Sequence, residues 1–363
     1  MRVLACLGLV VVGCGPPLTA STTVGARHAT PSPNAARLVR PVRPAQIDRI
    51  ILVTVDGVRA KDVLGEGARQ RLPNLWRLVE RGVALGAPGY GAPIVASGPR
   101  FVSLPGYREI LTGRRGNGCT DNECAPLAEP SLLDDARAAL GLHGDDVALV
   151  ASWPTLQRAA TNDPTAVAMS VGRHGGPTRA RFAVDDAATA LLARGEATLS
   201  FPGEDDYRPD AVTAPLALAY LHARQPHLLV VSLGDTDEWA HRGRVADYFA
   251  ALAAVDDFLG QLATEVAALD ADGGRTLVVV TSDHGRAANF RDHGRQPESQ
   301  PVWIVAAGGP IVARGLVAAA SQRRLCDIAP TLRLWLGLDA DLSPRAGLPI
   351  PELTTRADIA SLR

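Results

Sequence analysis

Lysine is almost absent from this sequence, and its net charge is close to zero. Lys61 is the only lysine among 363 residues, so arginine carries nearly all of the positive charge. The formal net charge is −1, which leaves no excess of positive charge for nucleic acid, and we expect no nucleic-acid partner. Hydrophobic residues make up 47% of the chain, which suffices for a large core and argues against a disordered protein.

Long hydrophobic runs are lacking as well. The apolar run Val3–Val12 is shorter than the roughly 20 residues of a transmembrane helix, but it suits the hydrophobic region of a signal peptide. It ends in Val11-Val12-Gly13-Cys14, which looks like a bacterial lipobox. We predict a lipoprotein-type signal peptide at residues 1–14, with a lipid on Cys14 that anchors an exported protein to a membrane, facing the periplasm or the cell exterior. A plain signal peptide, cleaved slightly later, is the alternative.

Composition divides the remaining chain into three parts, and no internal repeat is present. Residues 15–46 are rich in Pro, Ser, Thr and Ala and have no periodic apolar pattern, which predicts a flexible tether. A folded domain is expected over residues 47–348, followed by a C-terminal tail at residues 349–363.

Cysteines are few, and each has a separate interpretation. Cys6 lies inside the signal peptide, and Cys14 is the lipid site. Cys119 and Cys124 flank a polar, turn-forming stretch and could close a small disulfide loop in an oxidising compartment. A metal site is the weaker interpretation of this pair, because no second pair accompanies it. Cys326 is expected to be a buried thiol.

Apolar runs of strand length alternate with helical patterns over the predicted domain. The runs are continuously hydrophobic, which is typical of strands buried on both faces. The alternation predicts an α/β fold, a three-layer sandwich with a mainly parallel central sheet. The predicted strands are Ile50–Val55, Val147–Ala151, Leu228–Leu233, Leu277–Thr281 and Val302–Ala306. The predicted helices are Leu72–Gly82, Leu132–Leu142, Ala183–Ala193, Ala211–Ala223, Val245–Ala268 and Ile328–Leu336.

Acidic residues follow three of the predicted strands. Asp56 comes directly after the first strand, and Asp237 and Asp283 follow shortly after two others. Ligands of parallel sheets bind beyond the carboxyl ends of the strands, so we expect these acids at one edge of one sheet. The alternative is that each acid only caps the next helix.

Histidines accompany these acids. Asp237 and His241 are four residues apart, which places them on one side of a helix, and His284 adjoins Asp283. His293 follows in a glycine-containing loop. Carboxylate oxygen together with imidazole nitrogen is a typical ligand set for divalent metals, most commonly zinc. A surface hydrogen bond is the alternative for an isolated Asp-His pair.

Ser103 is the candidate nucleophile. Pro105 suits the first turn of a helix, which places Ser103 at a helix N-terminus, where an anion such as phosphate is stabilised. A hydroxyl there can be ionised by a metal and attack, although simple helix capping is the alternative. No G-x-S-x-G elbow or P-loop is present, and Gly89-Tyr-Gly91 does not extend into a dinucleotide motif.

Taken in order, these motifs resemble the alkaline phosphatase superfamily, above all its type I phosphodiesterase/nucleotide pyrophosphatase-like branch, which is related to sulfatases. The resemblance extends over nearly all of the predicted domain. The motifs that carry it are Val53-Thr-Val-Asp-Gly-Val-Arg59, Val102-Ser-Leu-Pro-Gly-Tyr107, Leu111-Thr-Gly113, Asp235-Thr-Asp-Glu-Trp-Ala-His241, Thr281-Ser-Asp-His-Gly285, Asp292-His-Gly294, Cys326-Asp-Ile-Ala-Pro-Thr-Leu332 and Leu336-Gly-Leu338.

The resemblance implies two divalent metal ions, most simply zinc, in a catalytic domain. One metal is expected on Asp237, His241 and His293. The other is expected on Asp56, Ser103, Asp283 and His284. The implied activity is hydrolysis of small phosphoric mono- or diesters, with Ser103 attacking phosphorus to form a covalent phospho-serine that water then cleaves.

Departures from the family's motifs leave alternatives open. Gly106 stands where many phosphodiesterases have Asn, and Ser103 stands where many have Thr. Sulfatases use a C/S-x-P-x-R motif, but Tyr107 occupies the position of its arginine, with Arg108 next to it. A sulfatase or phosphonate hydrolase on the same scaffold is one alternative, and a catalytically silent binding lipoprotein is another. Asn117, Asn122, Arg114 and Arg115 are candidates for contacting the substrate's free oxygens.

Overall fold

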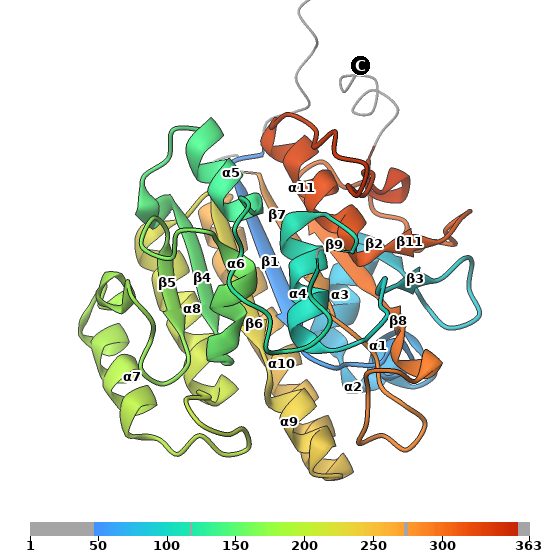
Figure 1. The fold of residues 1–363 in the computed structure, drawn as a ribbon, viewed down its shortest axis with the longest axis horizontal. Helices are drawn as coiled ribbons and strands as arrows, with labels where there is room; N and C mark the ends of the chain where they lie inside the picture. The colour runs from blue at the N-terminus through green and yellow to red at the C-terminus, as the bar shows by residue number, and fades with distance from the viewer. Residues whose placement is uncertain (1–46, 117, 272–274, 355–363) are drawn as a thin grey trace, which may run out of the picture. The chain divides into compact units, whose positions relative to one another are not determined.

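The computed structural model describes residues 47–116, 118–271 and 275–354, so the predicted signal peptide, tether, Cys14 and Asn117 lie outside it. An eight-stranded sheet has the order β10-β2-β9-β7-β1-β6-β4-β5, and a second sheet has the order β11-β3-β8 (Figure 1). The strands are β1 (Arg49–Val55), β2 (Gly82–Leu85), β3 (Ile94–Val95), β4 (Val147–Ala151), β5 (Ala168–Val171), β6 (Leu228–Leu233), β7 (Thr276–Thr281), β8 (Pro301–Val302), β9 (Ile304–Gly308), β10 (Gly315–Leu316) and β11 (Arg323–Arg324).

Helices cover both faces of the large sheet. On one face lie α4 (Ser103–Thr112), α5 (Leu132–Ala139), α6 (Gln157–Ala160) and α11 (Ile328–Leu336). On the other face lie α1 (Ala60–Leu64), α3 (Pro73–Arg81), α7 (Asp186–Ala197), α8 (Asp210–Arg224), α9 (Asp235–His241) and α10 (Val245–Leu269). The short α2 (Ala68–Arg71) joins α1 to α3. This confirms the predicted three-layer α/β sandwich.

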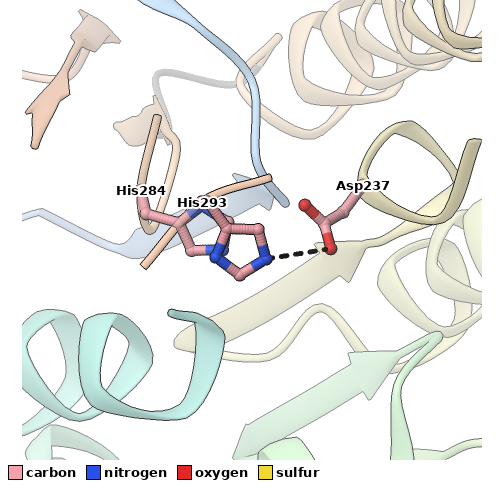
Figure 2. A group of neighbouring side chains, drawn as sticks. All are labelled: Asp237, His284 and His293. Carbon is pink, nitrogen blue, oxygen red and sulfur yellow. Dashed lines mark ion pairs between the residues drawn. The ribbon is translucent and has the colours of Figure 1, made fainter. Parts of the chain in front are cut away.

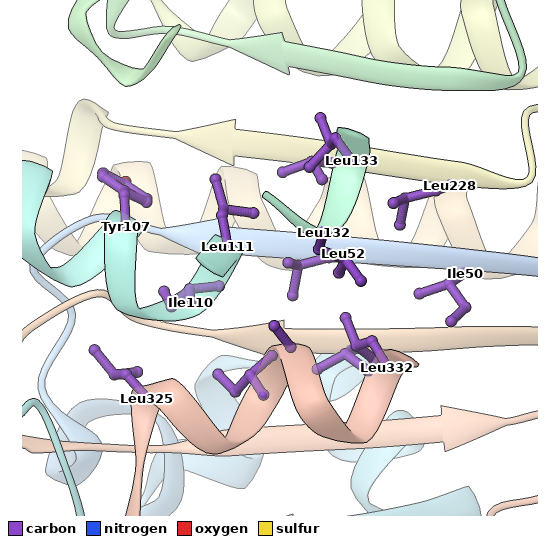
Figure 3. Packing of buried hydrophobic residues seen from close by; sticks show 14 of the residues in the cluster. Ile50, Leu52, Tyr107, Ile110, Leu111, Leu132, Leu133, Leu228, Leu325 and Leu332 are labelled. Atoms are coloured by element: carbon purple, nitrogen blue, oxygen red, sulfur yellow. The ribbon is translucent and has the colours of Figure 1, made fainter. Parts of the chain in front are cut away.

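Two hydrophobic clusters hold the layers together. The strands alternate between them, so that Ile50 and Leu52 of β1 pack towards α4, α5 and α11, and Ile51 and Val53 pack towards α3, α8 and α10 (Figure 3 shows the first cluster). Both faces are covered, which explains why the strands are continuously hydrophobic in the sequence. Burial at about 25 cal/mol per Å² makes these faces the main source of the domain's stability.

The sheet departs from the prediction at one side. The predicted strand Val302–Ala306 divides at Trp303, because Val302 pairs with Ile94 in the small sheet whereas Ile304 begins β9. β9 runs antiparallel to both β7 and β2, so the sheet is mixed at this side. The predicted helix Ala183–Ala193 lies further along the chain, at Asp186–Ala197, where Asp185 caps it through Ala188 N–H.

The C-terminal boundary of the folded domain also differs from the predicted one at residue 348. Ile350 and Leu353 belong to a hydrophobic cluster, and Glu352 pairs with Arg323. The packed region therefore includes at least the start of the tail that was predicted to begin at residue 349.

The predictions for Cys119, Cys124 and Cys326 agree with the structure, whereas Cys6 lies outside the described residues. Cys119 and Cys124 form a disulfide across five positions of sequence. Cys326 is a buried thiol, and burial raises its pKa to about 12, which makes it unreactive. Within the described residues, no helix combines the length and apolarity that a membrane span requires.

Three central strands bring the predicted acids to one edge. β1 lies between β6 and β7, with Val55 paired to Leu233 and Thr54 paired to Thr281. Because the three parallel strands end nearly level, the residues that follow them meet beyond the same edge of the sheet.

Candidate metal centre

The first group of side chains consists of Asp56, Ser103, Asp283 and His284. Asp56 follows β1, Asp283 and His284 follow β7, and Ser103 is the first residue of α4. Nε2 of His284 lies 3.3 Å from Ser103 Oγ, 3.4 Å from Asp56 Oδ1 and 3.4 Å from Asp283 Oδ2. Ser103 Oγ also lies 3.4 Å from Asp56 Oδ1. Four donor atoms from three separate segments thus surround one point.

These separations have the size of a metal coordination shell. Four ligands bound tetrahedrally to zinc at 2.0–2.1 Å lie about 3.3 Å from one another. A direct hydrogen bond network would draw the same atoms to about 2.7–3.0 Å. The observed spacing therefore fits a divalent cation better than it fits direct contacts among the four side chains.

The protonation states in this group also suit a cation. His284 Nδ1 lies 2.8 Å from the Gly285 carbonyl, which can only accept, so Nδ1 carries the proton and Nε2 presents its lone pair to the group. Asp283 Oδ1 accepts from Gly57 N–H, but its buried Oδ2 has no hydrogen-bond partner among the described residues. Burial and the nearby Asp237 raise the pKa of Asp283 to about 8. A bound dication would remove this cost of keeping the carboxylate ionised.

The second group consists of Asp237, His241 and His293. Asp237 Oδ2 lies 3.0 Å from His241 Nε2 and 3.9 Å from His293 Nε2, and the two histidine nitrogens are 2.9 Å apart. His293 Nδ1 donates to the Phe101 carbonyl at 2.9 Å, so its Nε2 also presents a lone pair. Asp237 and His241 lie one turn apart on α9, as their spacing predicted.

The two groups adjoin each other. The rings of His284 and His293 stack with centroids 4.0 Å apart, and Figure 2 shows both rings beside Asp237. Ligand atoms of Asp237, His284 and His293 all lie within 4.8 Å of one another. Two-metal hydrolases hold their ions about 3.5–4 Å apart, and the two groups are close enough for that arrangement. All seven residues singled out in the sequence therefore lie together.

Arg286 is a member of the site that the sequence did not reveal. It is fully buried, and its Nη1 pairs with Asp237 Oδ1 on the side opposite the histidines. Burial alone would raise the pKa of Asp237, but Arg286, His293 and His241 together hold it well below the usual range. Its position directly after Asp283-His-Gly285 is the only sequence signal that could have indicated this role.

Helix α4 presents Ser103 at its N-terminus, but Ser103 does not cap it through its side chain. Asn122 Oδ1 accepts instead from Leu104 N–H at 2.9 Å, so the serine hydroxyl faces the acids. The capping interpretation of Ser103 is therefore not supported. Gly106 explains the close approach of the helix, because a Cβ there would lie 2.4 Å from the Asp283 carbonyl oxygen.

The side chains of Tyr107 and Arg108 point in different directions, the first towards the metal-ligand candidates and the second away from them. The Tyr107 hydroxyl donates to Asp56 Oδ2 at 3.0 Å and accepts from Ser232 at 3.1 Å, so it orients a carboxylate of the first group. Arg108 points away and donates to the carbonyls of Ala125 and Arg158. No arginine of α4 therefore reaches the substrate side of Ser103.

A cavity of 110 Å³ opens onto Ser103. Of the candidates for contacting substrate oxygens, Asn122 lines it, whereas Arg114 is engaged by Glu129 and Asp341 elsewhere. Arg115 does not line it either. The remaining lining residues are Asp56, Trp153, Tyr207, Gly234, Asp237, Glu238, His241 and His293.

Comparison with known proteins agrees with this geometry. Residues 211–340 match the Metalloenzyme superfamily, and this span contains five of the seven site residues. No curated protein matches the sequence significantly.

Solved structures share the fold at low sequence identity. BT4656, in complex with its substrate D-glucosamine-2-N,6-O-disulfate, superposes with a TM-score of 0.60 at 14% identity, covering 85% of this chain and 80% of that one. The phosphonate monoester hydrolase of Agrobacterium radiobacter gives 0.57 at 16%, with 84% and 77% covered. The alkaline phosphatase PafA gives 0.58 at 12%, with 85% and 99% covered. Together, the match over residues 211–340 and the shared fold make the chain similar to metalloenzymes of the alkaline phosphatase-like superfamily.

Proposed function

We propose that this protein is a two-metal hydrolase of phosphoric esters in which Ser103 is the nucleophile. One observation carries the proposal: Ser103 Oγ occupies a position in the same 3.3–3.4 Å shell as Asp56 and His284. A serine hydroxyl that only capped a helix would face the backbone, whereas this one faces potential metal ligands.

The side chains around Ser103 suggest how each step of the hydrolysis would proceed. Divalent cations, zinc by the preference of this nitrogen and oxygen donor set, would supply Lewis acidity and the positive charge that phosphoryl oxygens require. The Ser103 hydroxyl lies between Asp56 Oδ1 and His284 Nε2, and a cation held by these two ligands would favour loss of its proton to water, while the departing alkoxide takes up a proton from water. The Oγ–P bond then forms as the bond from phosphorus to the alcohol breaks. Water cleaves the phospho-serine and restores the hydroxyl.

Several neighbours position these groups. Tyr107 holds Asp56, and Gly57 N–H holds Asp283. The N-terminus of α4 adds partial positive charge beside the phosphoryl group. Asn122 lies at the cavity wall, where its amide nitrogen can donate to a substrate oxygen, since its Oδ1 is occupied by Leu104 N–H.

A sulfate ester hydrolase is the second candidate, because BT4656 acts on a sulfated sugar. The resemblance associates formylglycine formation with an arginine two residues after the proline. Here Tyr107 occupies that position and binds Asp56, and Arg108 points away from the site. These contacts favour an unmodified serine. The intact mass of the purified protein tests this point, since conversion of Ser103 to formylglycine changes its mass.

Substitution of Ser103 tests the proposal directly. In Ser103→Ala, we expect hydrolysis of aryl phosphate esters to fall about a thousandfold or more, while bound metal remains, because the other three donors of its group persist. Rates with aryl phosphates and sulfates, and metal content by mass spectrometry, are the measurements. Ser321→Ala, at an exposed serine, is the matched control. Full activity of Ser103→Ala would rule out Ser103 as nucleophile.

A further inference from the structure

A second, larger cavity continues outward from the one at Ser103. It has a volume of 560 Å³. The two cavities share five lining residues, namely Asn122, Trp153, Tyr207, Glu238 and His241. An ester bound with its phosphorus at Ser103 would have to extend one of its alcohol groups into this outer cavity, since the inner cavity of 110 Å³ holds little more than the reacting group.

The outer cavity is strongly acidic. Three exposed acids line it, Glu123, Glu204 and Asp205, together with Glu238, whose pKa burial and the nearby Asp237 raise to about 7. Arg242 is the one arginine among its lining residues, and no lysine is among them. Its guanidinium already donates to the Pro202 carbonyl at 2.6 Å and lies 4.0 Å from Glu204.

This charge distribution excludes one kind of substrate and favours another. A polyphosphate, a nucleotide chain or a sulfated sugar would place further negative charge beside several carboxylates, where Arg242 is the one offsetting cation among the lining side chains of Lys and Arg type and is already engaged by Pro202. An alcohol group with a positive charge would be attracted instead. The acids thus select against the polyanionic substrates of a nucleotide pyrophosphatase.

A bound metal ion does not explain these carboxylates. Within the part of the chain that the structure describes, the groups of three or more acid, histidine or cysteine side chains close enough to share an ion are Asp237 with His284 and His293, and Asp56 with Asp283 and His284. The acids of the outer cavity are therefore spread around its wall. A dispersed negative wall suits a large organic cation better than it suits a small inorganic one.

Aromatic side chains add a second means of binding such a cation. Trp153 lines both cavities and is partly exposed, so part of its surface can contact a ligand. Tyr207 lines both as well but is buried, with its hydroxyl donating to Asp235 at 2.7 Å, so Trp153 offers the accessible aromatic surface. Aromatic faces bind quaternary ammonium groups through cation–π attraction, which adds to the charge of nearby carboxylates.

We propose that the outer cavity binds a cationic amino-alcohol group of the substrate, so that the preferred substrates are phosphate esters of alkylammonium alcohols. This inference deepens the proposed function and rests on it. The ester spans both cavities, with phosphorus at Ser103 and the ammonium group between Trp153 and the acids of the outer wall.

Two esters that differ only in charge test the inference. The first is p-nitrophenyl phosphocholine, and the second is its isostere in which carbon replaces the quaternary nitrogen. Both release p-nitrophenol, so the chemical step is matched. We expect kcat/KM of the metal-loaded enzyme to be about tenfold higher for the cationic ester. Equal values would overturn the inference and leave the proposed function intact.

Removing negative charges from the outer cavity tests whether the preference for the cationic ester arises there. In the double variant Glu123→Gln/Asp205→Asn, we expect the ratio of kcat/KM for the cationic ester to that for the neutral ester to fall severalfold. The double variant Glu66→Gln/Asp257→Asn removes the same charge from exposed positions away from both cavities and serves as the control. Equal falls in both double variants would assign the preference to net charge and overturn the inference.

Binding distinguishes failure of the inference from failure of the proposed function. Calorimetric titration of Ser103→Ala with each ester measures affinity without turnover, and we expect tighter binding of the cationic ester. If wild-type enzyme with bound metal hydrolysed neither these two diesters nor the aryl phosphate monoesters, the proposed function would fail, while this titration would still decide whether the cavity selects a cation. Equal affinities would contradict that selection.

Discussion

At the scale of single residues, Arg286 connects the two segments that supply the second group of candidate metal ligands, namely helix α9 and the loop that carries His293. Its Nη1 pairs with Asp237, while Nε and Nη2 donate to the carbonyls of Phe290 and Arg291 at 2.7 and 2.8 Å. Those carbonyls belong to the loop that carries His293. One buried guanidinium thus sets the distance between an acid on α9 and a histidine on a loop.

Replacement of Arg286 therefore disturbs both partners. Arg286→Met leaves Asp237 buried without its cation, and we expect about 3–5 kcal/mol lower free energy of unfolding in the metal-free protein. We also expect weaker metal binding, which a competition titration with a chelator measures. Arg244→Met removes an exposed arginine that pairs with Asp247, and it should cost less than about 1 kcal/mol. Equal effects of the two substitutions would contradict the role of Arg286.

Gly57 is a second residue on which the geometry depends. Its φ is +63°, and a Cβ would lie 2.1 Å from Asp237 Oδ1 and 2.5 Å from Arg286 Nη1. We expect Gly57→Ala to lose metal at the Asp237 group and at least about tenfold in activity, because Asp237 must move.

Gly89→Ala is the matched control, since Gly89 has a φ of +72° but open space where its Cβ would lie. Both substitutions carry the same backbone strain, and only Gly57→Ala adds the collision. Metal content and kcat measured for the two variants separate these effects. Similar losses in both would show that backbone strain, and not displacement of Asp237, is responsible.

The sequence predicted all seven residues that meet at the centre, because Asp56, Asp283 and His284 follow strands, Ser103 begins a helix, and Asp237, His241 and His293 belong to motifs whose order matches the resemblance. The supporting residues could not be identified in this way. Arg286 acts through a loop that folds back over it, and Tyr107 acts through a helix that crosses a strand end. Contacts of this kind depend on tertiary packing, which local patterns do not encode.

At the scale of elements, helix α4 contains a buried carboxyl group. Glu109 accepts from Ser97 N–H through both oxygens at 3.1 Å, yet burial raises its pKa to about 7. A raised folded-state pKa stabilises the fold most below the unfolded pKa of about 4.5, and this contribution is lost as the pH rises through 7.

We therefore expect Glu109→Gln to gain stability relative to wild type as the pH rises from 5 to 8, by on the order of 3 kcal/mol. Urea denaturation of both proteins at several pH values measures this difference, and groups common to both proteins cancel. A difference that did not change with pH would show that Glu109 keeps an ordinary pKa in the folded protein.

The elements with the strongest patterns were predicted well. β1, β4, β6 and β7 are continuous apolar runs, and their core positions in the sheet explain that pattern. The division at Trp303 was not predictable, because Val302 and Ile304 are equally apolar but pair with different sheets. The short strands β2 and β5 were missed as well, since four residues give too little periodicity to recognise.

At the scale of the whole molecule, the lipid anchor remains a prediction for residues outside those described. Full-length protein expressed in a bacterial host should incorporate a clickable fatty acid, and Cys14→Ser should abolish this label, because the lipid is attached through the thiol. Cys6→Ser, which lies within the predicted signal peptide, should retain the label. A wild-type chain released without label would indicate the plain signal peptide.

The origin of the ligands along the chain has a consequence for how the protein acquires its metals. The first group combines Asp56 and Ser103 with His284, and the second requires His293. A ribosome must therefore synthesise most of the polypeptide before either group can close, and shorter nascent chains hold only scattered donors. On the proposed function, complete metal loading would therefore have to wait until synthesis has passed His293, and the ion supply of the compartment where folding finishes would influence which metal is bound.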